Sequence, residues 1–194
     1  MPQRSVSLNI HQRPLSYAQR LDSRRIEDIN LFVVHCTELP DLAMARVYGE
    51  KVHYPEARTG NSGHFYIDRD GSIEQWVPLD RVAHHVRGFN PGSIGVELVN
   101  TGRYPDWFHS VNQKMSEPYP VPQFKALVAL IDHLQTRLTG LEEIAGHEDL
   151  DTGMIASEDR PDTMIRRKLD PGPLFPWSRL MRKVSLHRFY TENL

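Results

Sequence analysis

The chain has 194 residues, of which 39% are hydrophobic and 25% are charged, and its formal net charge is -2. This length allows one domain with a hydrophobic core of its own. The nearly balanced charge gives no sign of a polyanionic partner, so nucleic acid is not an expected ligand. The single cysteine, Cys36, excludes a disulfide within the sequence. No apolar run reaches the roughly 18 residues that span a bilayer, so no membrane partner is expected.

The N-terminal segment, residues 1–28, is polar and rich in arginine, and Pro14 interrupts it. This composition predicts an irregular, solvated lead-in. The segment lacks the apolar core of a secretory signal, so we expect a cytoplasmic protein. The run that follows, residues 29–36, is apolar and β-branched without polar alternation. Such a run is typical of a strand that is buried on both faces.

The next part of the chain predicts a helix, a hairpin and a strand. Residues 41–51 form the helix, with Asp41 as its N-cap after a proline. Residues 64–67 and 73–77 flank an Asp-Gly step, which strongly indicates a β-hairpin. Residues 93–99 have the apolar, β-branched composition of a further strand.

The clearest helix is predicted over residues 122–138, where apolar side chains recur at steps of three and four. Its proline lies in the first turn, and Gly140 follows its end, as helix termini favour. A long loop that contains three prolines precedes it over residues 101–121. Residues 144–147 are expected to form a short buried strand.

The C-terminal third is more irregular. Residues 148–167 are charged and without a period, which predicts a second insertion loop. The segment from Leu174 begins with a short amphipathic helix, and residues 185–194 are expected to be a tail. One domain over residues 29–184 accommodates these elements. The mixture of strands and helices predicts a mixed α/β fold of the α+β type, with a central mixed β-sheet flanked by helices.

Three residues form a candidate metal site. His35 ends the first apolar strand, His147 ends the strand after the long helix, and Asp170 precedes a Pro-Gly pair. Two histidines and one carboxylate can hold zinc and leave a fourth position for water. Water on zinc loses its proton near neutral pH and becomes a nucleophile. A histidine that ends an apolar strand is more often a packed residue, so each position alone is open to a structural interpretation.

Six short segments, in this order, carry a more specific signal. They are residues 33–37, 62–71, 76–78 with 83–85, 93–98, 145–147 and 167–173. Together they resemble the AmpD-type zinc amidases, or N-acetylmuramoyl-L-alanine amidases, a family related to the peptidoglycan recognition proteins. One such segment is weakly diagnostic, whereas the ordered set over roughly residues 30–177 is specific.

The resemblance implies a complete active site with one Zn²⁺ per chain. It implies that His35, His147 and Asp170 are the zinc ligands and that Glu97 and Lys168 are catalytic. In such an enzyme zinc-bound water hydrolyses the amide between the lactyl group of N-acetylmuramic acid and L-alanine. Glu97 would act as general base and acid, and Lys168 would stabilise the oxyanion. The segment between His147 and Lys168 is longer than in compact members of the family.

The residue types themselves support these roles. Glu97 interrupts an apolar strand, and because an unpaired buried carboxylate is costly, a position in a cleft is the better account. Lys168 lies two residues before Asp170, so both side chains share one face of an extended segment. His64 and His85 are candidate substrate-binding residues, with a purely structural role as the open alternative.

Muropeptides, the fragments of peptidoglycan, are the expected partners, and the protein is expected to be a monomer. Both the recycled anhydromuropeptide and the intact wall are candidate substrates. The alternative function is a non-catalytic peptidoglycan-binding module of the same fold, since a fold does not fix a function. The complete set of proposed ligand and catalytic residues favours the enzyme, because a binding module has no need of zinc.

Overall fold

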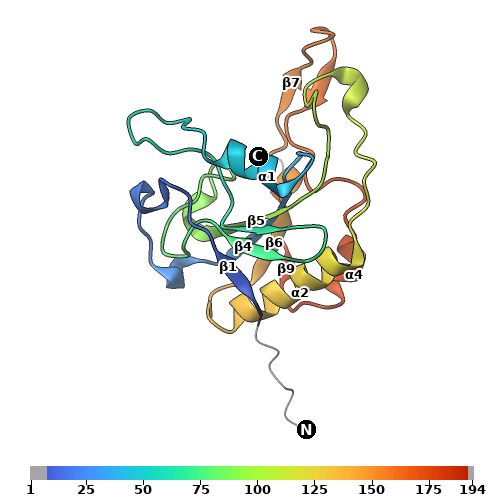
Figure 1. Cartoon of the computed structure of the whole chain (residues 1–194). Helices are drawn as coiled ribbons and strands as arrows, with labels where there is room; N and C mark the ends of the chain where they lie inside the picture. The colour runs from blue at the N-terminus through green and yellow to red at the C-terminus, as the bar shows by residue number, and fades with distance from the viewer. Residues whose placement is uncertain (1–7, 192–194) are drawn as a thin grey trace.

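The computed structural model describes residues 8–191, which form a mixed sheet with helices on its faces (Figure 1). The strands of the main sheet are β1 (Ile10–Gln12), β2 (Leu31–Cys36), β3 (Phe65–Ile67), β4 (Ile73–Gln75), β5 (Ser93–Leu98), β6 (Glu143–Gly146) and β9 (His187–Arg188). Their order across the sheet is β1-β4-β3-β5-β2-β6-β9. Only the β3–β4 hairpin is antiparallel among these neighbouring pairs. The predicted fold class is confirmed.

The helices lie between these strands in the sequence. The α-helices are α1 (Leu42–Gly49), α2 (Val121–Gln135), α3 (His147–Leu150) and α4 (Trp177–Met181). Short 3-10 helices are η1 (Ala18–Arg20), η2 (Ile26–Asp28), η3 (Asn90–Gly92) and η4 (Ser110–Asn112). A separate two-stranded sheet pairs β7 (Met154–Ala156) with β8 (Met164–Arg166). Between residues 8 and 191, no helix combines the length and the apolar character that a membrane span requires.

Strand β2 shows how the core determines which way the site residues point. Phe32 and Val34 belong to the largest apolar cluster, which includes the buried face of α2. Leu31 and Val33 belong to a different cluster on the opposite face of the sheet. Because side chains alternate along a strand, His35 shares the face of Leu31 and Val33. All six residues of β2 are buried, as the sequence predicts.

The predicted helices and hairpin are confirmed. The Asp41 carboxylate caps α1 by accepting a hydrogen bond from the Met44 backbone N–H at 2.7 Å. Helix α2 has its proline in the first turn and ends three residues earlier than the apolar pattern predicts. Gly71, at the Asp-Gly step of the hairpin, has a φ of 92°. This left-handed conformation suits glycine, which has no Cβ to clash.

The N-terminal segment is not a solvated lead-in, and this expectation is corrected from Ile10 onward. Strand β1 pairs in parallel with β4 and becomes the edge of the sheet. Leu15, Tyr17 and Leu21 are buried with Trp76 in a cluster on the face opposite α2. A few apolar side chains spaced within a polar, irregular segment give no period, so the sequence pattern does not reveal their burial. Residues 1–7 lie outside the described part.

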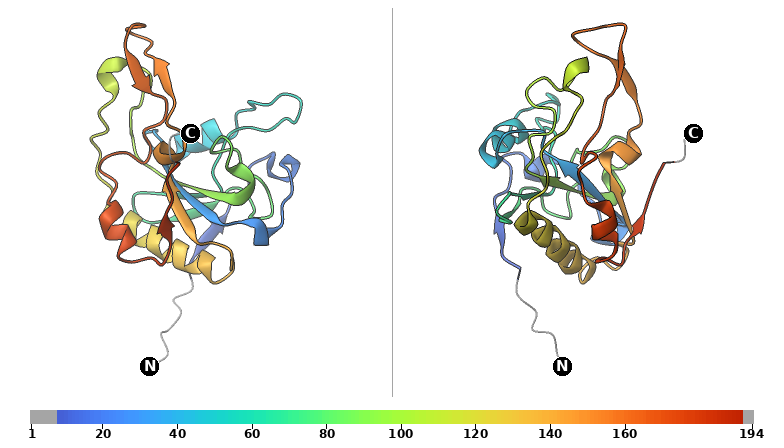
Figure 2. Two further views of the ribbon diagram at one scale, coloured as in Figure 1. Left: turned by 180° about the vertical axis from the view of Figure 1, so that it is seen from behind. Right: turned by 90° about the vertical axis from the view of Figure 1, so that its right-hand side faces the viewer.

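The C-terminal tail and the second insertion are also more ordered than the sequence predicts. Strand β9 extends the sheet beside β6, and Leu186 is buried next to it. Residues 192–194 lie outside the described part. The insertion of residues 148–167 contains most of α3 and the β7–β8 hairpin, and so is not an unstructured loop. This hairpin projects from the domain beside the segment that contains η4 (Figures 1 and 2).

Candidate metal centre and active-site cleft

His35, His147 and Asp170 converge from three different elements. His35 lies in β2, His147 is the first residue of α3, and Asp170 follows β8 in an irregular segment. His35 Nδ1 lies 3.0 Å from both His147 Nδ1 and Asp170 Oδ2, and His147 Nδ1 lies 3.1 Å from Asp170 Oδ2. The three side chains are therefore the corners of one nearly equilateral triangle of donor atoms, as the sequence predicts.

The chemistry of this triangle fits a zinc ion. Tetrahedral zinc with bonds of about 2.0–2.2 Å separates its ligand atoms by roughly 3.3–3.6 Å, only slightly more than the distances here. Burial lowers the pKa of His35 to about 4, so the ring is neutral near pH 7, as a metal ligand must be. Asp170 Oδ1 is buried without a hydrogen-bond partner. A buried carboxylate oxygen in that state is accounted for by a cation.

His85 orients the ring of His35. Its Nδ1 lies 3.0 Å from His35 Nε2, and its Nε2 lies 3.2 Å from the Ser93 hydroxyl. If His35 Nδ1 faces a metal, the ring proton of His35 is on Nε2, and this N–H donates a hydrogen bond to His85 Nδ1. Gly95 permits this packing, because a Cβ there would lie 2.5 Å from the His85 ring.

His147 is held by the polar contacts at the start of α3. The Asp149 carboxylate accepts a hydrogen bond from the Gly146 backbone N–H at 2.7 Å and another from Arg188 at 2.6 Å. The backbone N–H of Glu148 donates to the backbone oxygen of Asp170 at 2.9 Å. The first turn of α3 is thereby attached both to β9 and to the segment that contains Asp170.

Glu97 lies beside this triangle, in β5. Its Cα is the register partner of His35 in β2 and of Tyr66 in β3, so the three residues form one row across the sheet. Burial, followed by the nearby Asp170 carboxylate, raises the pKa of Glu97 to about 8, although the Lys168 charge opposes this. Near neutral pH this carboxyl is therefore able to hold a proton.

One open cleft of about 810 Å³ contains all five predicted metal and catalytic residues. Lys168 lines it together with Glu97 and the triangle of His35, His147 and Asp170. Its walls come from α1, from the loop between β5 and α2, and from the segment after the β7–β8 hairpin. The structure thus brings together the residues that the resemblance implies as zinc ligands and catalytic groups.

The two candidate substrate-binding residues, His64 and His85, differ in their position relative to the cleft. His85 lines the cleft, but both of its ring nitrogens already have protein partners. His64 is fully buried, and its Nδ1 accepts a hydrogen bond from the Gly95 backbone N–H at 3.1 Å. Its Nε2 lies 3.1 Å from the Arg81 carbonyl oxygen and 2.7 Å from Arg24. His64 therefore does not line the cleft, which favours the structural alternative for this residue over a contact with substrate.

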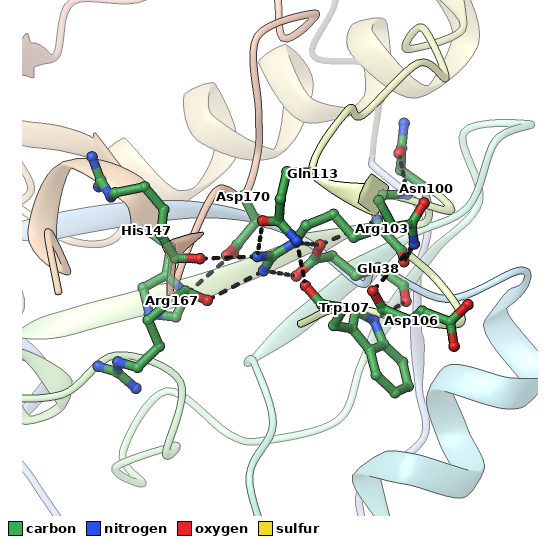
Figure 3. A network of polar contacts seen from close by, with 12 residues as sticks. Glu38, Asn100, Arg103, Asp106, Trp107, Gln113, His147, Arg167 and Asp170 are labelled. Atoms are coloured by element: carbon green, nitrogen blue, oxygen red, sulfur yellow. Dashed lines mark hydrogen bonds and ion pairs between the residues drawn. The ribbon is translucent and has the colours of Figure 1, made fainter. Parts of the chain in front are cut away.

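The sequence patterns did not single out two buried charged residues at the edge of the cleft. Glu38 follows β2, and Arg103 lies in the loop before α2; they form a buried ion pair (Figure 3). Arg103 also contacts the backbone just before Lys168. A charge in an aperiodic loop gives no sequence signal for burial, because its partners are distant along the chain.

A mixed sheet that holds a His-His-Asp triangle and a carboxylate in one cleft is typical of metal-dependent hydrolases. Residues 25–173 match the N-acetylmuramoyl-L-alanine amidase family. The chain belongs to this family, which confirms the resemblance found in the sequence.

Individual relatives agree with this assignment. The chain is 34% identical over 122 residues to the 1,6-anhydro-N-acetylmuramyl-L-alanine amidase AmpD of Enterobacter cloacae. That alignment covers 58% of this chain and 51% of the relative, so the chain spans about half of that protein. The structure of a selenomethionine derivative of AmpD superposes with a TM-score of 0.62 at 27% identity, over 90% of this chain and 94% of the other.

A third similar protein was solved with a substrate bound. It is the N-acetylmuramyl-L-alanine amidase AmiD from E. coli, in complex with anhydro-N-acetylmuramic acid-L-Ala-D-gamma-Glu-L-Lys. The TM-score is 0.61 at 25% identity, with 80% of this chain and 57% of the other covered.

Proposed function

We propose that this protein is a zinc-dependent N-acetylmuramoyl-L-alanine amidase. The bond it cleaves is the amide between the lactyl group of N-acetylmuramic acid and L-alanine, in peptidoglycan or in (anhydro)muropeptides. The observation that carries the proposal is the convergence of His35, His147 and Asp170 at 3.0–3.1 Å in a cleft that Glu97 and Lys168 also line.

His35, His147 and Asp170 would hold one Zn²⁺ per chain. When bound, zinc supplies Lewis-acid polarisation of the scissile carbonyl and acidifies water at neutral pH. The protein contributes the geometry of the three ligands. The hydrogen bond between His35 and His85 fixes the ring of the first ligand, and the contacts of Asp149 fix the turn that carries the second.

Glu97 and Lys168 would carry out the remaining chemistry. The carboxylate of Glu97 accepts a proton from the attacking water and then donates it to the leaving nitrogen of L-alanine. Its raised pKa suits a group that must both take and give a proton near neutral pH. The ammonium of Lys168 faces the negative charge that develops on the carbonyl oxygen in the transition state.

The proposed partners are muropeptides. The AmiD structure contains an anhydromuropeptide, and the open cleft of about 810 Å³ is of a size suited to such a fragment. Action as a monomer and a cytoplasmic location remain part of the proposal. In that compartment the recycled, soluble anhydromuropeptide would be the accessible substrate.

The decisive experiment is product analysis by mass spectrometry of purified anhydromuropeptides incubated with the protein. The expected products are a peptide that begins with L-alanine and the released anhydro-N-acetylmuramic acid. A chelator should abolish the reaction, and added zinc should restore it. Cleavage within the peptide would indicate a peptidase instead. Binding without cleavage would support the non-catalytic module.

A further inference from the structure

Arg103 is buried in the wall of the cleft, with 1% of its surface exposed. Its Nε and Nη2 donate to the two carboxylate oxygens of Glu38 at 2.6 and 2.8 Å. Its Nη1 donates to Gln113 Oε1 and to the carbonyl oxygen of Arg166, both at 3.1 Å. Its Nη2 also donates to the carbonyl oxygen of Arg167 at 3.2 Å (Figure 3). These five contacts match the five N–H donors of a guanidinium.

The guanidinium of Arg103 therefore joins three separate parts of the cleft. Glu38 lies three residues after His35 and two residues past the end of β2. Gln113 belongs to the loop between β5 and α2, as does Arg103 itself. The carbonyl groups of residues 166–167 belong to the backbone immediately before Lys168. Only arginine offers five donors in one rigid plane, so lysine cannot make the same set of bonds.

The residues around Glu38 hold it in the conformation in which its carboxylate pairs with Arg103. Glu38 has a φ of 48°, a left-handed conformation that is unusual for a residue other than glycine. The indole N–H of Trp107 donates to the Glu38 carbonyl oxygen at 2.9 Å. Gly102 lies so close that a Cβ there would be 2.6 Å from Glu38 Cγ. The backbone and the carboxylate of Glu38 are thus both held by the loop that carries Arg103.

Lys168 depends on its backbone for its position. Over residues 8–191, the structure gives the Lys168 side chain no hydrogen bond and no ion pair. Asp170, in contrast, contacts His35 and His147 and accepts a backbone hydrogen bond at 2.9 Å from Glu148. Loss of the Arg103 contacts should therefore displace Lys168 more than it displaces the ligand triangle.

We propose that Arg103 is a positioning residue that fixes residues 166–167 so that the Lys168 ammonium faces the cleft. All five of its donors are engaged, so it acts through the backbone and has no donor left for a substrate. The part of the proposal that concerns turnover rests on the proposed amidase function, in which Lys168 stabilises the oxyanion. The positioning itself can be measured without any substrate.

The main test is the double variant Glu38→Leu/Arg103→Met. It removes both charges together, because removing one alone would leave the other buried and unpaired. Zinc content and melting temperature should stay close to those of the wild type. The value of kcat should fall by about 10- to 100-fold with KM changed less than about 3-fold, as expected for a misplaced catalytic group.

The Lys168→Ala background separates positioning from a general structural effect. There, the same double change should lower kcat by less than about 2-fold, because two residues that act through one group are not additive. An equal loss in both backgrounds would overturn the proposal. The single variant Arg103→Lys retains the charge beside Glu38 without the full set of bonds, so its kcat should also fall. Wild-type turnover of that variant would likewise overturn the proposal.

A second measurement needs no activity. The Arg167 backbone N–H donates to the Gly153 carbonyl oxygen at 2.9 Å, so its hydrogen exchange reports on this segment. Exchange should be faster in the Glu38→Leu/Arg103→Met variant, and an unchanged rate would overturn the proposal. If the wild type cleaves no muropeptide, the proposed function fails, and the exchange rate still decides the positioning.

The matched control is the ion pair of Arg69 with Glu117, whose two contacts measure 2.6 and 3.0 Å. It also anchors the loop between β5 and α2, but it does not line the cleft. The variant Arg69→Met/Glu117→Leu should leave both kcat and the exchange of Arg167 unchanged. The same acceleration of exchange in this control would show general loosening of the loop and would count against Arg103.

Discussion

His35 and Glu97 are register partners on the neighbouring parallel strands β2 and β5. Both side chains point away from α2, because Val34 and Val96, the residues before them, fill the apolar cluster that includes α2. The register of two central strands, and not a loop, therefore places a proposed metal ligand beside the proposed proton carrier. A shift of the β5 register by one residue would point the Glu97 side chain into the apolar core.

Replacing Glu97 with glutamine should nearly abolish turnover while zinc stays bound. The amide has the same shape but cannot carry the proton, and this role is typically worth about 10²- to 10⁴-fold in rate. Initial rates and metal content should be measured on the same preparation. A rate within a few-fold of the wild type would remove Glu97 from the mechanism.

In the Lys168→Ala variant, the fold decrease in kcat should exceed the fold increase in KM. The ammonium is proposed to face a charge that exists only in the transition state. The loss of such a donor costs about 10²- to 10³-fold in rate. Steady-state kinetics on a soluble muropeptide test this, and an altered KM with an unchanged kcat would make Lys168 a substrate-binding residue.

His85→Ala should weaken zinc binding. Removing the partner of His35 Nε2 frees the ring of the first ligand, and changes of this kind cost about 10- to 100-fold in metal affinity. The variant of the neighbouring residue, His84→Ala, is the control. His84 also lines the cleft, but within the described residues it makes no hydrogen bond to the triangle of His35, His147 and Asp170. Competition with a chromogenic chelator measures both. Equal affinities for the two variants would assign His85 a role other than orienting His35.

Much of the fold was predictable because its central elements carry strong local signals. The apolar run of β2, the Asp-Gly turn before β4 and the periodic stripe of α2 each define an element without outside help. Strands β1 and β9 carry no such signal, because both are short edge strands whose formation depends on pairing with the neighbouring strand. Leu15 and Tyr17 are buried only because Trp76 offers them a surface.

The site was predictable to the extent that it matches an ordered family pattern. That pattern pointed to His35, Glu97, His147, Lys168 and Asp170, and the structure places all five in one cleft. It could not separate His64 from His85, because burial behind a strand depends on packing and not on residue type. Nor could any pattern find a buried ion pair whose two partners come from different loops.

The metal-free protein should show the titration of Glu97 as a pH-dependent loss of stability. Burial, followed by Asp170, raises the folded pKa to about 8, whereas glutamate in an unfolded chain titrates near about 4.3. Between these values the folded state binds the extra proton, so the free energy of unfolding falls as pH rises. Glu97→Gln removes this effect. In chelator, the variant should melt close to the wild type near pH 5 and above it near pH 8.

Glu50 provides a control of opposite sign. Hydrogen bonds from Ser16 and the charge of Arg46 outweigh burial and lower the pKa of Glu50. The ionised Glu50 carboxylate therefore stabilises the folded state above the unfolded pKa, and this stabilisation is lost as pH falls. The Glu50→Gln variant should accordingly be less stable than the wild type at pH 8, and the difference should shrink in acid. Parallel pH profiles for the Glu97 and Glu50 variants would contradict the raised pKa of Glu97.

The tip of the β7–β8 hairpin should influence which substrates are cleaved. The Glu158 backbone N–H donates to the Phe108 carbonyl oxygen at 2.9 Å, and Asp159 accepts two hydrogen bonds from Ser110 at 2.5 and 2.8 Å. Phe108 lines the cleft, so the hairpin tip holds one wall of the cleft in place. A wall built from two inserted segments can select among muropeptides without touching the ligand triangle.

The test replaces residues 157–163 with Asn-Gly, a two-residue turn that preserves the pairing of Ala156 with Met164. Zinc content and melting temperature should change little, because the tip lies outside the apolar clusters. The ratio of rates on soluble anhydromuropeptide and on polymeric wall should change, since release of Phe108 widens the cleft. Loss of folding would make the tip structural, and an unchanged ratio would show that the wall does not select substrates.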